Sequence, residues 1–188
     1  MFANQHTAAL IAGMDKAPPA EYWLDELRDG THVLVRPLSA DDHAGLLRFF
    51  QQLSPLSLRF RFLGAIAHVD ERIMDALMTD AQGDGMGYVA LIHTFGELQI
   101  IGFSHYRRVD KEDRCECAVA VADPWQRKGL GHLLLGHLID AARRSGYKRI
   151  GSTDLSTDYP IHRLYKRFGF GSAYLGRDFD RIVHDLEL

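Results

Sequence analysis

Two glycines, Gly129 and Gly131, stand at the start of an apolar repeat, and three polar residues precede them: Gln126, Arg127 and Lys128. The first N–H groups of a helix have no acceptor within the helix and carry partial positive charge. Glycine lets a phosphate approach such groups because no Cβ intervenes. A pyrophosphate at this position would meet several N–H donors and two cations. The alternative is an ordinary glycine-containing turn, and loop composition alone does not separate the two.

Glu116 is a carboxylate next to a mainly apolar segment, residues 117–122, and it stands before Asp123 in the chain. Burial disfavours the charged form of a carboxylate and raises its pKa. A raised pKa brings the group toward the range that suits a general base near neutral pH. The alternative is a charge at the start of a strand that faces solvent. The residues alone favour this second alternative.

The elements that must position these residues follow from the hydrophobic pattern. Residues 117–122 form a short apolar run with β-branched members, which is typical of a buried strand. The polar, glycine-bearing segment 125–131 predicts a turn. Helical spacing then follows in the apolar residues Leu130, Leu133, Leu134, Leu138, Ile139 and Ala142. The stretch therefore predicts a strand, an anion-binding loop and a helix.

Two common phosphate-binding loops do not fit this segment. A Walker A loop needs Lys followed by Ser or Thr directly after its last glycine, whereas His132 and Leu133 follow here. A dinucleotide fingerprint needs a third glycine at position 134, which is Leu. A kinase-like nucleotide binder is therefore disfavoured.

The remaining pattern, Gln126-x-x-Gly129-x-Gly131, resembles the acyl-CoA pyrophosphate loop of the GNAT N-acetyltransferase superfamily. The flanks extend the resemblance, because GNAT domains have an apolar strand before the loop and a long amphipathic helix after it. They then have a strand, a short helix and a closing Gly-Phe. Residues 147–154 and 160–170 of this chain match those parts.

The resemblance covers residues 33–188. Within the superfamily, the segments ECAVAVAD (116–123) and LRFFQQLSPLSLRFRFLG (47–64) are similar to the acetyltransferase domain of bacterial protein lysine acetyltransferases. The implied fold is a mixed α/β (α+β) one. It has a mostly antiparallel sheet of six to seven strands, flanked by helices on both faces. We expect one such domain over residues 30–188, preceded by a partly helical extension over residues 1–29.

The implied activity is transfer of an acetyl group from acetyl-CoA to a primary amine. A lysine-type amine has a pKa near 10.4, so removing its proton at pH 7 costs about 4.6 kcal/mol. The resemblance places the catalytic base at Glu116. It places a general acid for the leaving thiol at Tyr165, whose alternative role is packing in the core.

The resemblance also implies the cofactor contacts. Backbone groups of Val119, Ala120 and Val121 would hold the pantetheine arm. The diphosphate would lie on the loop formed by Gln126, Arg127, Lys128, Gly129, Leu130, Gly131 and His132. The family often has Asn where this chain has Asp158, and an ionised Asp cannot donate a hydrogen bond. We expect Asp158 to cap the following helix, and a contact of Asp158 with the cofactor stays open.

Composition restricts the other partners. The formal net charge of −3 argues against a protein that binds nucleic acid by neutralising phosphates. No apolar run approaches the roughly 20 residues that span a membrane. The only cysteines, Cys115 and Cys117, are too few for a tetrahedral metal site, so we expect no metal. A cytoplasmic, reduced protein is the default, and residues 1–29 could pack on the domain or on a second subunit of a homodimer.

Two alternatives stay open for the function. The acceptor is either a protein lysine, as the closer resemblance suggests, or a small-molecule amine. A non-catalytic GNAT domain that senses acyl-CoA or acts as a scaffold is the alternative to an enzyme.

The remaining elements follow from local pattern. Residue 39 and Pro55 mark two helix starts, and helical turns are also expected within 21–28 and 69–79. Strands are expected at 32–38, 88–94, 98–107, 147–154, 170–175 and 181–188.

Overall fold

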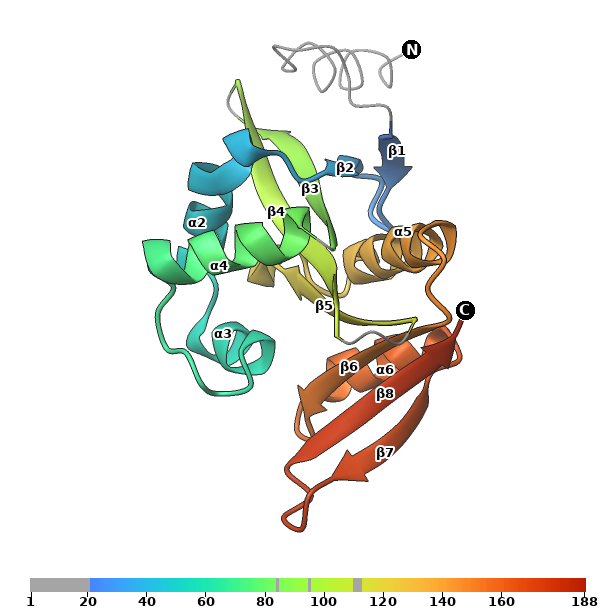
Figure 1. The fold of residues 1–188 in the computed structure, drawn as a ribbon. Helices are drawn as coiled ribbons and strands as arrows, with labels where there is room; N and C mark the ends of the chain where they lie inside the picture. The colour runs from blue at the N-terminus through green and yellow to red at the C-terminus, as the bar shows by residue number, and fades with distance from the viewer. Residues whose placement is uncertain (1–20, 84, 95, 110–112) are drawn as a thin grey trace.

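A computed structural model describes residues 21–83, 85–94, 96–109 and 113–188 (Figure 1). These residues form one eight-stranded sheet in the order β1-β2-β3-β4-β5-β6-β8-β7. The strands are β1 (Trp23–Glu26), β2 (His32–Pro37), β3 (Met86–Thr94), β4 (Glu97–Arg108), β5 (Arg114–Val121), β6 (Arg149–Leu155), β7 (Gly171–Leu175) and β8 (Arg181–Glu187). The α-helices are α2 (His43–Gln51), α3 (Pro55–Arg61), α4 (Glu71–Gln82), α5 (Leu130–Arg144) and α6 (Tyr159–Arg167), with 3-10 turns η1 (Ala40–Asp42) and η2 (Asp123–Trp125).

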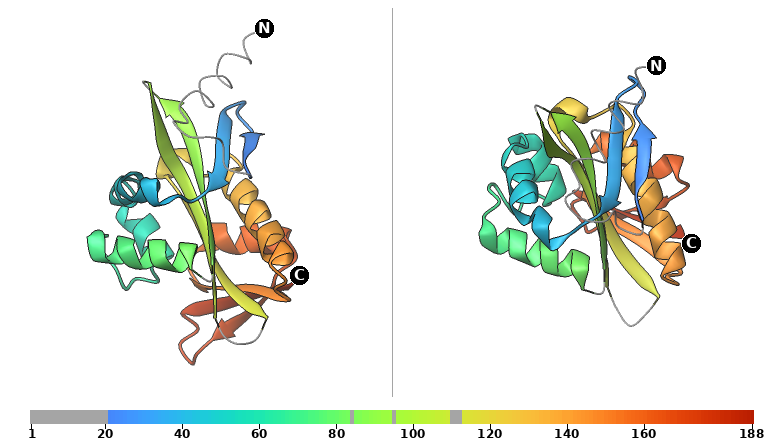
Figure 2. Two further views of the ribbon diagram at one scale, coloured as in Figure 1. Left: turned by 45° about the horizontal axis from the view of Figure 1, so that its top comes forward. Right: turned by 90° about the horizontal axis from the view of Figure 1, so that it is seen from above.

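Helices cover both faces of the sheet, as Figure 2 shows from two directions. Helix α5 packs on one face, where Leu134 and Leu138 are fully buried. Helices α2 and α4 pack on the other face, where Phe50 and Met74 are fully buried. Gly102 of β4 allows α5 to come close, because a Cβ at that position would lie 2.8 Å from Leu134 Cδ1. The predicted fold class is confirmed, with one strand more than the predicted maximum.

The additional strand is β1, and here the prediction of a helical turn within residues 21–28 was wrong. Strand β1 pairs antiparallel with β2, from Trp23 opposite Val35 to Glu26 opposite His32. Trp23 also stacks on His137 of α5, with ring centroids 4.0 Å apart. Pairing with a distant strand decides the conformation of this short segment, and local sequence does not report such pairing. The expected helix within residues 1–20 lies outside the described residues.

The feature of the sheet that matters most for function is a gap between β5 and β6. These strands are parallel and pair only at their beginnings, where Arg114, Cys115 and Glu116 lie opposite residues 149–151. Strand β5 then continues to Val121, paired only with β4, and β6 continues to Leu155, paired only with β8. The sheet therefore opens directly after Glu116, between the two strands that flank helix α5 in the sequence.

Candidate active site

A cavity of about 1510 Å³ extends through this gap. Its walls come from α3, β4, β5, the loop before α5, β6 and α6. The volume exceeds the roughly 300–1,000 Å³ of ordinary small-molecule pockets, so it leaves room for an extended ligand and a second reactant. The predicted site residues that line it are Glu116, Val119, Ala120, Val121, Gln126, Arg127, Lys128, Gly129, Gly131, His132 and Asp158. The side chains of Leu130 and Tyr165 lie instead in the core.

The loop before α5 lines this cavity with Gln126, Arg127, Lys128, Gly129 and Gly131. The N–H groups of residues 127–131 donate to no acceptor among the residues that the structure describes, whereas His132 N already bonds to Gly129 O. Gly129 has φ +104°, a left-handed conformation that glycine adopts without strain. A row of unpaired N–H groups at the start of a helix binds anions well. The loop therefore has the free amides that the predicted cradle requires.

A hydrogen-bonded clamp fixes the beginning of this loop. Ser54 Oγ donates to Asp123 Oδ1 at 2.6 Å, and Ser57 Oγ donates to the same oxygen at 2.8 Å. Burial acts to raise the pKa of Asp123, but the hydrogen bonds from both serines outweigh it and lower the pKa. Gln126 Nε2 donates to Ser57 Oγ and to Val121 O, each at 3.1 Å. The Gln126 side chain therefore holds the loop against α3 and β5.

The β1–β2 turn supports the same loop from the other side. Lys128 Nζ lies 3.0 Å from Asp29 Oδ2 and 4.5 Å above the Trp125 ring. Arg28 N donates to Lys128 O at 3.0 Å, and the Arg28 side chain lies beside Gly129. Lys128 was expected to meet a phosphate, but its ammonium already has an acid partner. Arg28, which sequence reasoning missed, joins the cavity wall.

Glu116 lies where β5 and β6 separate, and it lines the cavity. Its carboxylate accepts a hydrogen bond from Arg107 Nη2 at 2.9 Å, and about a third of the side chain is exposed. The carboxylate is therefore ion-paired and partly exposed, as the solvent-facing alternative predicted, but it lines the cavity. A carboxylate in this place can accept a proton from a reactant in the gap.

Asp154 is a second carboxyl group in the cavity, and sequence reasoning missed it. It lies on β6 and accepts a hydrogen bond from Ser152 Oγ at 2.7 Å. Burial raises the pKa of Asp154 to about 7, and the negative charges of Asp158 and Glu116 act in the same direction. An acid within a strand was the signal that singled out Glu116, and applied to residues 149–155 it would have found Asp154 too.

Arg61, the last residue of α3, brings a cation to the same cavity. Its Nη2 lies 3.4 Å from His105 Nδ1, and its buried Nε has no hydrogen-bond partner within the described chain. Burial lowers the pKa of Arg61 to about 10, so the guanidinium keeps its charge at neutral pH. Burial, together with the charge of Arg61, holds the pKa of His105 well below its usual range, so the imidazole is neutral.

Comparison with known proteins agrees with this geometry. The model of the acetyltransferase (GNAT) family matches residues 56–170, which hold α3, the gap, the loop and α6. The chain belongs to the GNAT family of acetyltransferases. It is 38% identical to acetyltransferase PA5475 of Pseudomonas aeruginosa over 172 residues, 92% of each chain.

Solved GNAT structures share the fold. The GNAT domain of PAT from S. lividans superposes with a TM-score of 0.80 at 24% identity, covering 92% of this chain and all of that one. A cAMP-binding acyltransferase from Mycobacterium smegmatis superposes with a TM-score of 0.61 at 18% identity, covering 98% of this chain and 50% of that one. Among the helices that the structure describes, none is both long and apolar enough to cross a lipid bilayer.

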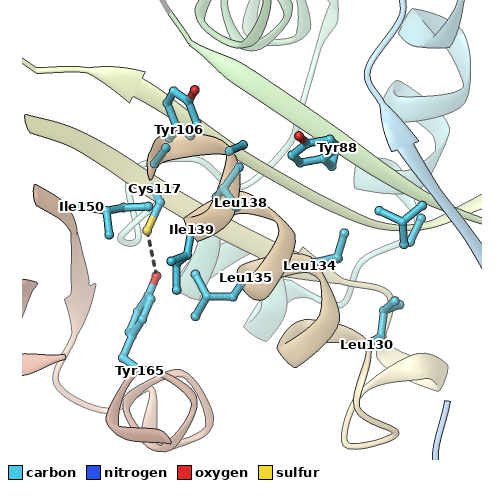
Figure 3. Packing of buried hydrophobic residues seen from close by; sticks show 14 of the residues in the cluster. Tyr88, Tyr106, Cys117, Leu130, Leu134, Leu135, Leu138, Ile139, Ile150 and Tyr165 are labelled. Atoms are coloured by element: carbon cyan, nitrogen blue, oxygen red, sulfur yellow. Dashed lines mark hydrogen bonds between the residues drawn. The ribbon is translucent and has the colours of Figure 1, made fainter. Parts of the chain in front are cut away.

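Within this GNAT domain, Tyr165 lies in the core and not on the cavity wall. Its side chain is fully buried, and its hydroxyl lies 3.9 Å from Cys117 Sγ (Figure 3). Burial, together with the nearby Cys117, raises the pKa of Tyr165 well above its ordinary value. The side chain packs in the core, while its hydroxyl contacts Cys117, a residue of the cavity wall.

Asp158 has the role in this domain that its position in the sequence predicts. It caps α6, accepting from Ile161 N at 3.2 Å. Burial raises the pKa of Asp158, although the hydrogen bond from Ile161 opposes the rise. The capping prediction is confirmed, and the residue also lines the cavity.

Proposed function

We propose that the chain is an N-acetyltransferase that moves the acetyl group of acetyl-CoA to a primary amine. The observation that supports this most is that three features lie together in one cavity. Unpaired amides at residues 127–131 lie in the loop before α5, and Glu116 lies where the gap between β5 and β6 begins. Asp154 adds a second carboxyl group from the part of β6 that borders the gap.

The residues present fit an acyl-CoA. The amides of residues 127–131 suit its diphosphate, with the side chains of Arg28 and Arg127 as nearby cations on the wall. Beyond Glu116, the edge of β5 that faces β6 has no strand partner. The backbone of residues 119–121 can therefore take an extended, amide-containing arm as a further strand would. When bound, acetyl-CoA would supply a thioester whose carbonyl carbon accepts the amine and whose sulfur leaves as a thiolate, which gains the proton that the attacking nitrogen loses.

Glu116 is our candidate for the base. An amine arrives mostly as an ammonium ion, and releasing its proton at pH 7 costs about 4.6 kcal/mol for a lysine-like pKa. Glu116 takes that proton and passes it to water through its exposed side, which leaves the nitrogen lone pair free to attack. Asp154 acts earlier, because its carboxylate form, about half populated at pH 7, attracts the ammonium and holds it near Glu116.

A pair of measurements on Glu116→Gln tests this function. Calorimetry with acetyl-CoA reports binding, and thiol release with an amine acceptor reports turnover. We expect unchanged binding and a loss of turnover on the order of 10²- to 10⁴-fold, the usual contribution of a general base. Glu187→Gln is the control, since that glutamate is 86% exposed on β8 and far in the chain from the cavity lining.

Two results would contradict the proposal. Absence of acetyl-CoA binding by the natural chain would remove its basis. Binding without turnover by the natural chain would instead favour a sensor or scaffold, and equal turnover by Glu116→Gln would remove Glu116 from the chemistry. A melting curve of each variant separates loss of activity from loss of folding, because Glu116→Gln also removes the ion pair with Arg107.

A further inference from the structure

The end of the cavity near Glu116 carries a charge that the acetyl-transfer chemistry does not use. Ser57 and Arg61 are four positions apart on α3 and therefore share one face of the helix. Ser57 reaches Asp123 at the loop, so Arg61 lies about 6 Å further along the helix axis, at about 1.5 Å per residue. The guanidinium lines the same cavity as Glu116 and is within electrostatic reach of it.

The guanidinium has no anionic partner within the described chain. Its one hydrogen bond to a side chain goes to His105 Nδ1 at 3.4 Å, and that imidazole is neutral. The ring of Phe62 lies 5.0 Å from its Cζ, and its Nε has no partner. A partly buried guanidinium with no paired counterion costs stability, and its planar fork matches a carboxylate. The missing partner is therefore an anion that a ligand would bring.

Opposite charge is present in the same cavity but at separate positions. Asp154 and Glu116 both act electrostatically on Arg61, yet neither lies within 4.0 Å of its nitrogens. Glu116 is paired with Arg107, and Asp154 accepts from Ser152. The chamber thus has a positive pole at Arg61 and a negative pole at the two acids. A ligand that carries an ammonium and a carboxylate is complementary to both poles.

We propose that the acceptor is a small amine that also carries a carboxylate, such as an amino acid, with Arg61 binding the carboxylate while the amine lies at Glu116 and Asp154. This rests on the proposed function and specifies its substrate class. A lysine side chain of a protein brings a cation without an anion. It would leave Arg61 unpaired and place two cations in one chamber, which the cavity disfavours electrostatically.

A matched acceptor series tests the proposal. Glycine, β-alanine, 4-aminobutyrate, 6-aminohexanoate and L-glutamate are each compared with the corresponding primary amide, using acetyl-CoA and thiol release with mass detection of the product. A lysine peptide blocked at both ends is the protein-like acceptor. The variants are Arg61→Gln and Arg61→Lys. Arg59→Gln is the matched control, because Arg59 lies on the same helix but is exposed.

We expect one or more acids to exceed the matching amide in kcat/KM by on the order of 10- to 100-fold, the size expected for hydrogen bonds to a charged group. Arg61→Gln should abolish this preference, Arg61→Lys should restore part of it, and Arg59→Gln should keep it. Acids and amides of equal activity, a preference that persists in Arg61→Gln, or acetylation of the peptide alone would each overturn the inference.

Its failure is distinguishable from failure of the proposed function. Calorimetry and slow hydrolysis of acetyl-CoA, measured without acceptor, report on the cofactor site alone. If the natural chain binds acetyl-CoA and acetylates the amides or the peptide but none of the acids, the acceptor class is wrong and the proposed function stands. If acetyl-CoA is neither bound nor hydrolysed, both fail.

Discussion

The raised pKa of Asp154 predicts an unusual dependence of stability on pH. Burial moves this pKa from 3.8 to about 7, so the folded protein holds a proton there that the unfolded chain releases. Between these two values stability falls as pH rises, because the folded state binds the additional proton. At about 1.36 kcal/mol per pH unit the full interval corresponds to roughly 4 kcal/mol. Asn cannot ionise, so Asp154→Asn escapes this cost.

Asp154→Asn should therefore be more stable than the natural chain at pH 8, and the difference should disappear toward pH 4. For a chain of this length, 1 kcal/mol shifts the melting temperature by about 2–4 °C. Urea unfolding of both proteins from pH 4 to 9 measures the difference in their free energies of unfolding. Most other ionisable groups titrate alike in the two proteins, so their contributions cancel in this difference. Asp140→Asn is the control, since Asp140 is 61% exposed on α5. A difference that does not change between pH 5 and 8 would refute an elevated pKa for Asp154.

Two further predictions concern the loop and the core. Gly129→Ala forces a Cβ into φ +104°, which we expect to cost about 1–2 kcal/mol of unfolding free energy and to weaken acetyl-CoA binding measured by calorimetry. Gly136→Ala is its control, because a Cβ there meets only the Phe168 ring at an ordinary 3.8 Å, and equal losses in both would contradict the reasoning. Tyr165→Phe should keep kcat within about twofold because the side chain is fully buried in the core, whereas a general acid would lose on the order of 10²-fold or more.

The sequence predicted well those parts of the fold that local pattern decides. The strand before the loop, the loop itself and α5 lie in one continuous stretch, and their periodicity is decisive without knowledge of any partner. Strand β1 was missed because its four residues become a strand only through pairing with β2. The gap between β5 and β6 could not be predicted from local pattern, since divergence of two strands leaves no mark on the spacing of either.

The same distinction applies to the site. The glycine loop could be predicted because its residues are adjacent in the chain. The clamp from Ser54 and Ser57 to Asp123 could not, because it joins positions 66 and 69 residues apart. Lys128 was assigned to phosphate on composition, and only the fold shows that Asp29 already pairs with it. Arg61 belongs to no motif of the sequence, and its missing partner became visible only with the cavity in place.

The chemical meaning of Arg61 and Asp154 follows from comparison with perturbed groups elsewhere in the fold. Burial also raises the pKa of Tyr88 and of Tyr106, but those hydroxyls are hydrogen-bonded to Glu21 and Ser145 at 3.0 and 2.9 Å. These two tyrosine hydroxyls therefore have their hydrogen-bond partners within the protein. Arg61 and Asp154 have opposite charges in one cavity and yet do not pair with each other. Ionisable groups whose burial costs stability are typical of sites where a ligand provides the missing partner. We therefore expect an acceptor that carries both an ammonium and a carboxylate.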